Sequence, residues 1–299
     1  MAKDFFLKRY RQLGEEILPV KLKTAIRTNT LKISPEELKE RLWHRGILIW
    51  KIPFITNGFF IERSRFSPSA AIEHLQGLFY IQEGASQIAV DILDAKPNES
   101  VLDMAASPGG KATQIAAQMQ NTGCLVALDI KKIEALCNNL ERMGVENTIV
   151  YNMDALNASE LKMEFDKILL DAPCSGNYVI DNKWFEKRDI EGIMANAERQ
   201  KLLLKAAVSV LKKNGTLVYS TCSLEPEEDE MVVDWALKNL PLNLEPVNCI
   251  GSDGLVNVFG RQLNPEIRKT KKLWPQKTGT QGFFIAKFRK NKIEAEAEE

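Results

Sequence analysis

Residues 101–111, with the sequence VLDMAASPGGK, decide the fold of this chain. They predict an apolar strand that ends at Asp103, a turn of small residues with two glycines, and a helix that begins at Gly110. Such a turn lets the backbone approach a ligand closely, and the helix N-terminus offers unpaired N–H groups to a carboxylate or another anion. The spacing fits neither GxGxxG nor the GxxxxGK(S/T) order of a phosphate-binding loop, which argues against a dinucleotide or ATP.

Strands and helices alternate from residue 100 to the last apolar segment of the chain. Helices are expected at 110–119, after the strand at 124–130 with an end at residue 143, at 188–213 and at 226–239. The strands that follow the first are CLVALDI (124–130), NTIVYN (147–152), FDKILLDAP (165–173), TLVYSTCS (216–223) and GFFIAKF (282–288). Apolar strands separated by helices are typical of a parallel sheet that is covered on both faces. We therefore predict an α/β fold with a doubly wound, Rossmann-like sheet.

Acidic residues stand at the ends of three consecutive strands. Asp103 ends the first strand, Asp129 ends the second and Asp154 follows the third. Ligands of such sheets lie at the carboxyl ends of the strands, where an acid about 20 residues after the glycine-rich turn holds ribose hydroxyls. Asp154 would then meet an adenine edge. Each acid alone is more often a helix cap, but three in this pattern favour a ligand site.

The fourth and fifth strands of this pattern each lead to a cysteine. Asp171 and Cys174 lie in DAPCSG, and Cys222 lies in YSTCS. If the two strands are neighbours, both thiols and the carboxylate converge. They could be a redox pair or inert buried thiols. A third interpretation is chemical: a thiolate added at carbon 6 of a pyrimidine makes carbon 5 nucleophilic, and a carboxyl at Asp171 could hydrogen-bond the ring.

Residues 1–75 predict a small N-terminal α+β module. Its expected elements are a helix at 5–18, strands at 25–32, 47–52 and 59–64, and a helix that starts with a capping box at 34–37. The module could lie on RNA or serve only for packing. Its candidate polar contacts with RNA are Arg27, Asn29 and Lys32.

Residues 67–96 are expected to be helical. Tyr80, Gln82 and Glu83 in this segment either belong to a helix that braces the sheet or border the ligand pocket. The large domain is expected at 76–290, and an acidic tail at 291–299.

Composition sets limits on function. The 40 basic and 40 acidic side chains balance, but Lys and Arg exceed acids in residues 1–51 and 261–292, so both ends could face phosphate or be plain solvated surface. Five cysteines without framework spacing indicate reduced thiols and a cytoplasmic protein. No apolar run reaches the roughly 20 residues of a membrane span.

A metal site is not expected. The chain has two histidines, and no Cys or His pair has zinc-finger spacing. The acidic run 225–230 is expected to be the start of a helix, with Pro226 in the first turn and acids favoured by the helix dipole.

Six segments together resemble the NOL1/NOP2/sun family of RNA 5-methylcytosine methyltransferases, which use S-adenosylmethionine. They are AIRTNTLK, GLFYIQEGAS, DMAASPGGKA, LDAPCSG, YSTCSLEPEEDE and LWPQKTGTQGFFIAKF, and they extend from about residue 27 to 288. The resemblance implies a class I methyltransferase fold with an RNA-recognition-like N-terminal module. It also implies that Cys222 attacks carbon 6, and that Cys174 assists breakdown of the covalent adduct. The donor would be held by Ala105, Ala106, Ser107, Pro108, Gly109, Gly110, Lys111, Asp129, Asp154 and Asp171.

Two departures from the family pattern concern specificity. Asn177 and Tyr178 replace the usual Thr-Gly after PCSG, and Glu134 stands near the place of a basic residue. Lys131 or Lys132 would then have to substitute for that residue.

The resulting expectation is a monomer that methylates carbon 5 of cytosine in RNA. We expect tRNA as the substrate, by analogy with the short archaeal members. An rRNA substrate is the first alternative. A noncatalytic RNA-binding or ribosome-assembly factor is the second, although it would not need both thiols.

Overall fold

The computed structural model describes residues 2–131 and 133–291. Its largest sheet has nine strands among these residues, in the order β11-β14-β15-β9-β8-β5-β6-β7, with β10 paired to β15. They are β5 (Ser100–Asp103), β6 (Cys124–Asp129), β7 (Thr148–Asn152), β8 (Phe165–Asp171), β9 (Leu211–Thr221), β10 (Leu242–Glu245), β11 (Ser252–Asp253), β14 (Lys271–Leu273) and β15 (Phe283–Lys290). Strands β5 to β9 pair in parallel, as predicted, whereas β15 runs antiparallel to β9.

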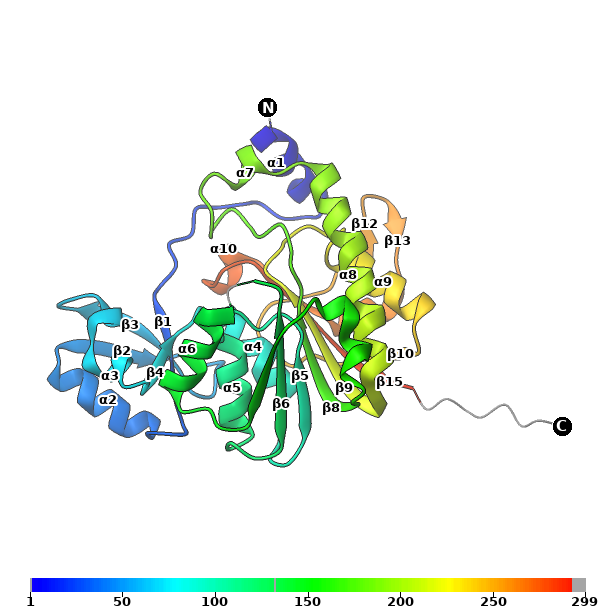
Figure 1. Ribbon diagram of the computed structural model, residues 1–299. Coiled ribbons are helices and arrows are strands. Elements are labelled where there is room, and N and C mark those ends of the chain that lie inside the picture. Colours follow the sequence, from blue (N-terminus) through cyan, green and yellow to red (C-terminus); the bar gives the residue numbers. More distant parts are fainter. Residues whose placement is uncertain (1, 132, 292–299) are drawn as a thin grey trace.

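Helices cover both faces of this sheet (Figure 1). Neighbouring strand residues pack to opposite sides: Val101 joins the core on one face, and Leu102 joins the core on the other. Strands buried on both faces are therefore apolar along their whole length, and the doubly wound fold is confirmed. The first face carries α4 (Gly84–Leu93), α5 (Gly110–Gln118) and α6 (Ile133–Met143), and the second carries the 3₁₀-helix η2 (Ala155–Leu161), α8 (Ile190–Val210) and α9 (Glu230–Asn239).

The small module lies at one side of the large sheet and has a four-stranded antiparallel sheet in the order β2-β3-β1-β4. Its elements are β1 (Ala25–Thr28), α2 (Pro35–His44), β2 (Ile47–Lys51), β3 (Gly58–Ser64), the 3₁₀-helix η1 (Pro68–Ala70), α3 (Ile72–Leu75) and β4 (Phe79–Ile81). The capping box is confirmed: the Ser34 hydroxyl accepts from the Glu37 N–H at 3.2 Å, and the Glu37 carboxylate accepts from the Ser34 N–H at 3.1 Å.

The expectation of one helical segment at 67–96 is wrong. Strand β4 interrupts it and pairs with β1, so the sheet of the small module reaches Ile81 rather than ending at residue 75. The strand has only three residues, which is too short for a period-2 pattern to stand out from a helical one.

The first helix, α1 (Ala2–Gln12), packs on the large domain and not on the small module. The ring of Phe6 lies 4.7 Å from that of Trp184 in α7 (Trp184–Lys187). The helix ends earlier than the predicted residue 18, because Gly14 takes a left-handed φ of 83°. The chain then runs from α1 past the large domain to β1 (Figure 1).

The remaining elements follow strand β9. They are the hairpin β12 (Asn257–Val258) and β13 (Arg261–Gln262), the 3₁₀-helix η3 (Pro265–Lys269) and the short helix α10 (Pro275–Thr278). The predicted acidic tail falls outside the described residues apart from Asn291. None of the helices in the described part of the chain is both long and apolar enough to cross a membrane.

Candidate active site

The sulfur atoms of Cys174 and Cys222 lie 3.2 Å apart. Strands β8 and β9 are parallel neighbours, with Asp171 in register with Ser220, so the loops that follow them start side by side. Both thiols are free and half-buried. The hydrogen bond with Cys222, together with burial, raises the pKa of the Cys174 thiol well above its usual value. The Cys174 thiol therefore stays protonated at neutral pH.

Asp171 forms an ion pair beside the thiols. Its Oδ2 accepts a hydrogen bond from Lys111 Nζ at 2.6 Å, and its Oδ1 accepts one from the Ser220 hydroxyl at 2.8 Å. Lys111 comes from the first turn of α5. Burial lowers the pKa of Lys111, but the carboxylates of Asp171 and Asp103 outweigh it, so the net shift is upward. The site thus holds a permanent positive charge between two acids.

Asp103 lies fully buried at the end of β5. Its Oδ1 accepts a long hydrogen bond of 3.3 Å from the Ala105 N–H, and its Oδ2 has no hydrogen-bond partner among the described residues. Burial raises the pKa of this carboxyl to about 7, against the opposing charge of Lys111. Its strand-end position was predicted, but not its burial beneath the turn.

The carboxylate of Asp129 fixes the glycine-rich turn. Oδ2 accepts from the Ser107 N–H at 3.0 Å, and Oδ1 accepts from the Lys131 N–H at 2.8 Å. Within the turn, the Ser107-Pro108 peptide is cis and Gly109 has a φ of 107°, which L side chains rarely adopt. Asp129 therefore shapes the turn and also faces the cavity described next.

A cavity of about 370 Å³ opens along the carboxyl ends of β5, β6 and β7. Asp154 lies at its rim, where Oδ1 caps η2 through the Leu156 N–H at 3.1 Å and Oδ2 pairs with Arg199 at 3.1 Å. Sequence reasoning missed Arg199, because nothing in the helical pattern of α8 distinguishes it. The lining residues are Met104, Ala105, Asp129, Ile130, Lys131, Met153, Asp154, Ala155, Pro173, Arg199 and Leu203.

Of the two lysines that could replace the family's basic residue after Asp129, the structure describes Lys131. Lys131 lines this cavity, and Glu134 stands in the first turn of α6. Lys132 lies outside the described residues.

A second cavity of about 200 Å³ lies beside the Lys111–Asp171 ion pair. Tyr80 in β4 and Gln82 directly after it line this cavity together with Lys111 and Asp171, so this segment borders the cavity. Glu83 has a different role: its carboxylate caps α4 through the Ala85 N–H at 2.7 Å. Ala106, Ser107, Pro108 and Gly110 complete this wall.

The prediction that Arg27 and Asn29 contact RNA is wrong. Arg27 is buried and donates to the Gly110 carbonyl at 2.5 Å and to the Thr113 hydroxyl at 2.8 Å. Asn29 is fully buried and donates to the carbonyl of Met143 at 2.7 Å. Lys32 likewise donates to a backbone carbonyl, that of Arg142, at 2.7 Å. These side chains connect the small module to the large domain.

The departure at Asn177 has a structural role. Its buried amide donates to the carbonyl of Cys222 at 2.9 Å and to that of Gly282 at 3.1 Å. One side chain therefore connects the loop that follows Cys174 to the end of β9 and to the start of β15.

The acidic run is not the beginning of a helix, because α9 starts only at Glu230. Its side chains are buried and bind specific partners. Glu225 accepts from Tyr10 at 2.6 Å, Glu227 from Arg9 at 2.7 Å, Glu228 from Ser175 at 2.9 Å, Asp229 from Thr221 at 2.5 Å, and Glu230 from Lys272 at 2.8 Å. No group of three or more His, Cys, Asp or Glu suited to a metal ion occurs within residues 2–131 and 133–291.

Two protein-family models match the chain. That of 16S rRNA methyltransferase RsmB/F covers residues 90–289, and that of the N-terminal domain of 16S rRNA methyltransferase RsmF covers residues 4–84. The tRNA (cytosine(49)-C(5))-methyltransferase of Pyrococcus abyssi is 39% identical over 90% of this chain and 88% of its own length. Ribosomal RNA small subunit methyltransferase F of Vibrio cholerae is 38% identical over 90% of this chain. The chain spans 58% of the Vibrio protein and 35% of a 28S rRNA (cytosine-C(5))-methyltransferase of Mus musculus.

Solved structures agree with this fold. A methyltransferase homolog protein from Pyrococcus horikoshii, 43% identical, superposes with a TM-score of 0.84 over 90% of this chain and 87% of that one. NSun6 from the same organism, solved with SFG, is 28% identical and superposes with a TM-score of 0.81 over 97% and 95%. The chain therefore belongs to the RsmB/F family of methyltransferases, as the resemblance of its motifs to the NOL1/NOP2/sun proteins indicated.

Proposed function

We propose that this chain transfers a methyl group from S-adenosylmethionine to carbon 5 of a cytosine in RNA. The observation that carries the proposal is the 3.2 Å contact between Cys174 and Cys222, beside the Lys111–Asp171 ion pair at the carboxyl edge of the sheet. The relatives named as cytosine-C5 methyltransferases of tRNA and rRNA support it.

The cavity at the ends of β5 to β7 has the chemistry that the donor needs. Each carboxylate oxygen of Asp129 accepts one backbone hydrogen bond, from the N–H of Ser107 or of Lys131. Each oxygen therefore keeps a lone pair for a ribose hydroxyl. Ile130, Ala155 and Leu203 supply apolar walls for an adenine ring. The solved NSun6 relative carries SFG, an analogue of S-adenosylmethionine, which supports this donor. When bound, the donor supplies an electrophilic methyl group.

The thiolate of Cys222 would attack carbon 6 of the cytosine and push the electrons of the C5–C6 double bond onto carbon 5. Carbon 5 then forms its bond to the methyl group as the sulfur–methyl bond of the donor breaks. The carboxyl of Asp171, already held by Lys111 and Ser220, would hydrogen-bond the base and stabilise the adduct.

Release of the product needs a base for the carbon 5 proton. Cys174 keeps its own proton mainly because of its hydrogen bond to Cys222. Once the Cys222 sulfur is bonded to carbon 6 it has no negative charge, so Cys174 can release its own proton to the solvent and become a thiolate. Cys174 would then take the carbon 5 proton, the C5–C6 double bond would re-form, and Cys222 would leave as a thiolate.

We propose tRNA as the substrate. The Pyrococcus abyssi relative acts on cytosine 49 of tRNA by its name, and the chain spans 88% of it. An rRNA is the second candidate, because both family models carry the name of 16S rRNA methyltransferases. The proposed thiol chemistry needs reduced cysteines, which fits a reducing compartment such as the cytoplasm.

The test uses the purified chain with methyl-labelled donor and, separately, unmodified tRNA and rRNA. Cys222→Ala should abolish methyl transfer, whereas Cys174→Ala should accumulate a covalent RNA adduct on a denaturing gel. Cys137→Ala is the matched control, because this free thiol is exposed on α6. Undiminished transfer by Cys222→Ala would remove the proposed nucleophile.

A further inference from the structure

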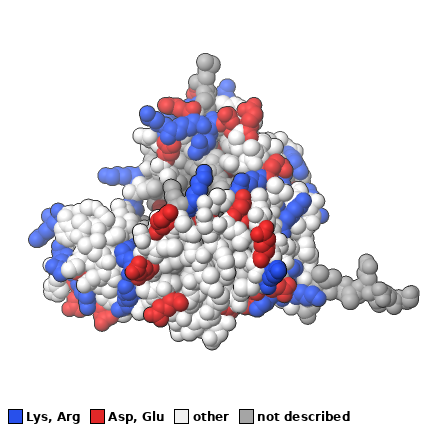
Figure 2. Space-filling model, in the orientation of Figure 1, with Lys and Arg blue, Asp and Glu red and all other residues white. Residues whose placement is uncertain are grey.

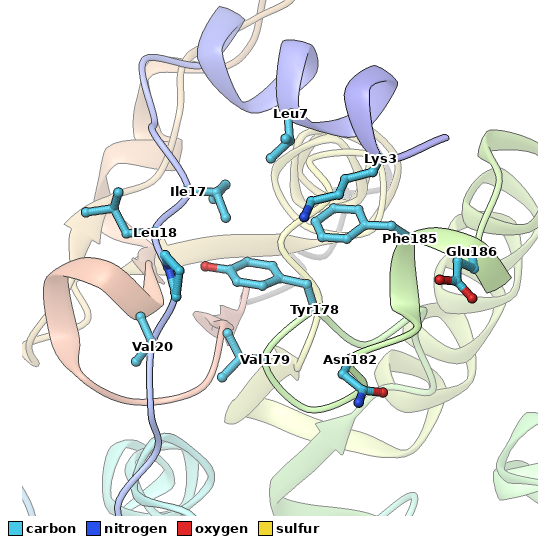
Figure 3. A pocket seen from close by; sticks show the side chains of 11 residues that line it. Lys3, Leu7, Ile17, Leu18, Val20, Tyr178, Val179, Asn182, Phe185 and Glu186 are labelled. Carbon is cyan, nitrogen blue, oxygen red and sulfur yellow. The ribbon is translucent and has the colours of Figure 1, made fainter. Parts of the chain in front are cut away.

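A large cavity of about 710 Å³ lies outside the donor and thiol sites (Figure 3). Helix α1 forms one wall, the segment at 17–20 forms the second, and the loop at 178–186 forms the third. Apolar and aromatic side chains dominate its lining, with Lys3 and Glu186 at the rim. We propose that this cavity binds an unstacked nucleobase of the same RNA strand that presents the target cytosine. The inference rests on the proposed function and extends it to a second base.

The loop that lines this cavity also contacts the thiol site. Tyr178 forms part of its wall and directly follows Asn177, whose amide donates to the Cys222 carbonyl at 2.9 Å. An RNA strand that presents a base to Cys222 would come close to this loop, so a neighbouring base of that strand is the ligand that we assign to the cavity.

Two aromatic rings give the cavity a surface for stacking. The rings of Tyr178 and Phe185 lie 5.7 Å apart and are nearly parallel, at 17°. Lys3 Nζ lies 5.9 Å from the centre of the Phe185 ring. Stacking on aromatic faces beside a cation is the general way in which proteins hold unpaired bases.

The hydroxyl of Tyr178 is a buried polar group in the wall of this cavity, to which Lys3, Asn182 and Glu186 also contribute polar groups. It points across the cavity toward Leu18 (Figure 3) and has no hydrogen-bond partner in the described part of the chain. Burial raises its pKa to about 12, so it stays protonated and can donate. The edge of a base offers acceptors of the kind it lacks.

The charge around the cavity also suits RNA. Lys21 and Lys23 are exposed directly after the lining segment, and Lys183 is exposed on the opposite loop. Figure 2 shows Lys and Arg side chains near the top of the molecule, where α1 and α7 lie, interspersed with Asp and Glu. A phosphate backbone would be neutralised along this path.

The experiment measures binding without turnover. Fluorescent single-stranded oligocytidylate and unfractionated tRNA are titrated with the wild type, Tyr178→Ala, Tyr178→Phe and Leu18→Glu. Tyr178→Ala should weaken RNA binding about five- to hundredfold, the range of one base–aromatic stack. Tyr178→Phe keeps the aromatic ring and should lose less RNA affinity than Tyr178→Ala. Leu18→Glu places a negative charge on the opposite wall, on an exposed residue, and should weaken binding as well.

Matched measurements separate the outcomes. Tyr151→Ala changes an exposed tyrosine on the edge strand β7 and should leave RNA affinity unchanged. Affinity for S-adenosylhomocysteine should be unchanged in all variants, and so should the yield of the Cys222 adduct at saturating RNA when each variant also carries Cys174→Ala.

Unchanged RNA affinity in both Tyr178→Ala and Leu18→Glu would overturn the inference, as would a wild type that binds neither RNA. A loss of affinity in Tyr178→Ala alone would assign Tyr178 to holding the loop and would also overturn it. Failure of the proposed function is a different result: the Cys174→Ala protein would form no Cys222 adduct, whether or not Tyr178 affects RNA binding.

Discussion

The carboxylate of Glu228 holds Ser175 by two hydrogen bonds, from its backbone N–H at 2.9 Å and from its hydroxyl at 2.5 Å. Ser175 directly follows Cys174, and Glu228 lies in the acidic run after Cys222. The same carboxylate therefore connects the two segments that carry the thiols. Burial raises the pKa of Glu228, against the hydrogen bonds that favour its charged form.

Glu228→Ala should destabilise the chain and displace Cys174. The substitution leaves the Ser175 N–H and hydroxyl buried without their acceptor. Each such unsatisfied group lowers the free energy of unfolding by about 1–3 kcal/mol. Chemical denaturation should show a lower free energy of unfolding, and the covalent RNA adduct should break down more slowly. Glu266→Ala is the control, since this exposed acid pairs with Lys269, three residues later on the surface. Equal stability of the two variants would contradict the role of Glu228.

Asp103 should make stability depend on pH. Its pKa is about 7 in the folded chain and about 3.9 in an unfolded one, so the folded state binds the proton more tightly. The contribution of this group to stability therefore falls as pH rises from about 4 to about 7 and is constant above that. Asp103→Asn keeps the side chain neutral, so its stability relative to wild type should rise by up to about 4 kcal/mol across this window.

The measurement is urea denaturation of both proteins at several pH values. Asp253→Asn is the control, because this acid is exposed and its partner Lys271 lies at the surface. A stability difference for Asp103→Asn that does not change with pH would show that Asp103 has an ordinary pKa.

The sequence was sufficient to predict the parts of the site that lie on regular elements. Parallel strands place their carboxyl ends at one edge, so the meeting of Cys174 with Cys222 and the position of Asp129 at the turn followed from the strand pattern. Arg27 was misassigned because a strand residue with a positive charge resembles a phosphate contact until its tertiary partners are known.

The acidic run shows a second reason why prediction stopped short. Local rules assign acids near Pro226 to a helix start, yet the partners Tyr10, Ser175 and Lys272 come from distant parts of the chain. Long-range pairing of buried charges leaves no periodic signal in the sequence. Strand β4 was missed because it is too short for its pattern to be resolved.

Arg27→Ala should uncouple the small module from the glycine-rich turn. The guanidinium donates to the Gly110 carbonyl and the Thr113 hydroxyl, so its loss removes two buried hydrogen bonds and leaves a cavity beside α5. We expect a stability loss of about 2–4 kcal/mol and weaker binding of S-adenosylhomocysteine, both measured by calorimetry. The salt dependence of RNA binding should stay unchanged, because Arg27 touches no phosphate. Arg63→Ala, an exposed position on β3, is the control. A weaker salt dependence of RNA binding in Arg27→Ala alone would show that Arg27 contacts RNA phosphate after all.

Lys272 should be among the side chains on which the site depends most, although it touches neither thiol. It is fully buried, with Nζ 2.8 Å from Glu230 and 3.1 Å from Asp229, and Asp229 in turn accepts from Thr221, the residue before Cys222. Burial lowers the pKa of Lys272, but the two carboxylates outweigh it and hold the lysine charged.

Lys272→Met removes the charge while nearly keeping the volume, so two buried carboxylates lose their counter-ion. Breaking a buried pair in this way costs about 3–5 kcal/mol, and the end of β9 should shift enough to slow adduct formation at Cys222. Lys271→Met is the matched control on the same strand, because its partner Asp253 is at the surface and such pairs contribute less than about 1 kcal/mol. The measurement compares the denaturation curves and the adduct yields of Lys272→Met and Lys271→Met. If Lys272→Met were as stable and as reactive as Lys271→Met, the buried ion pairs would not be what holds Cys222 in place.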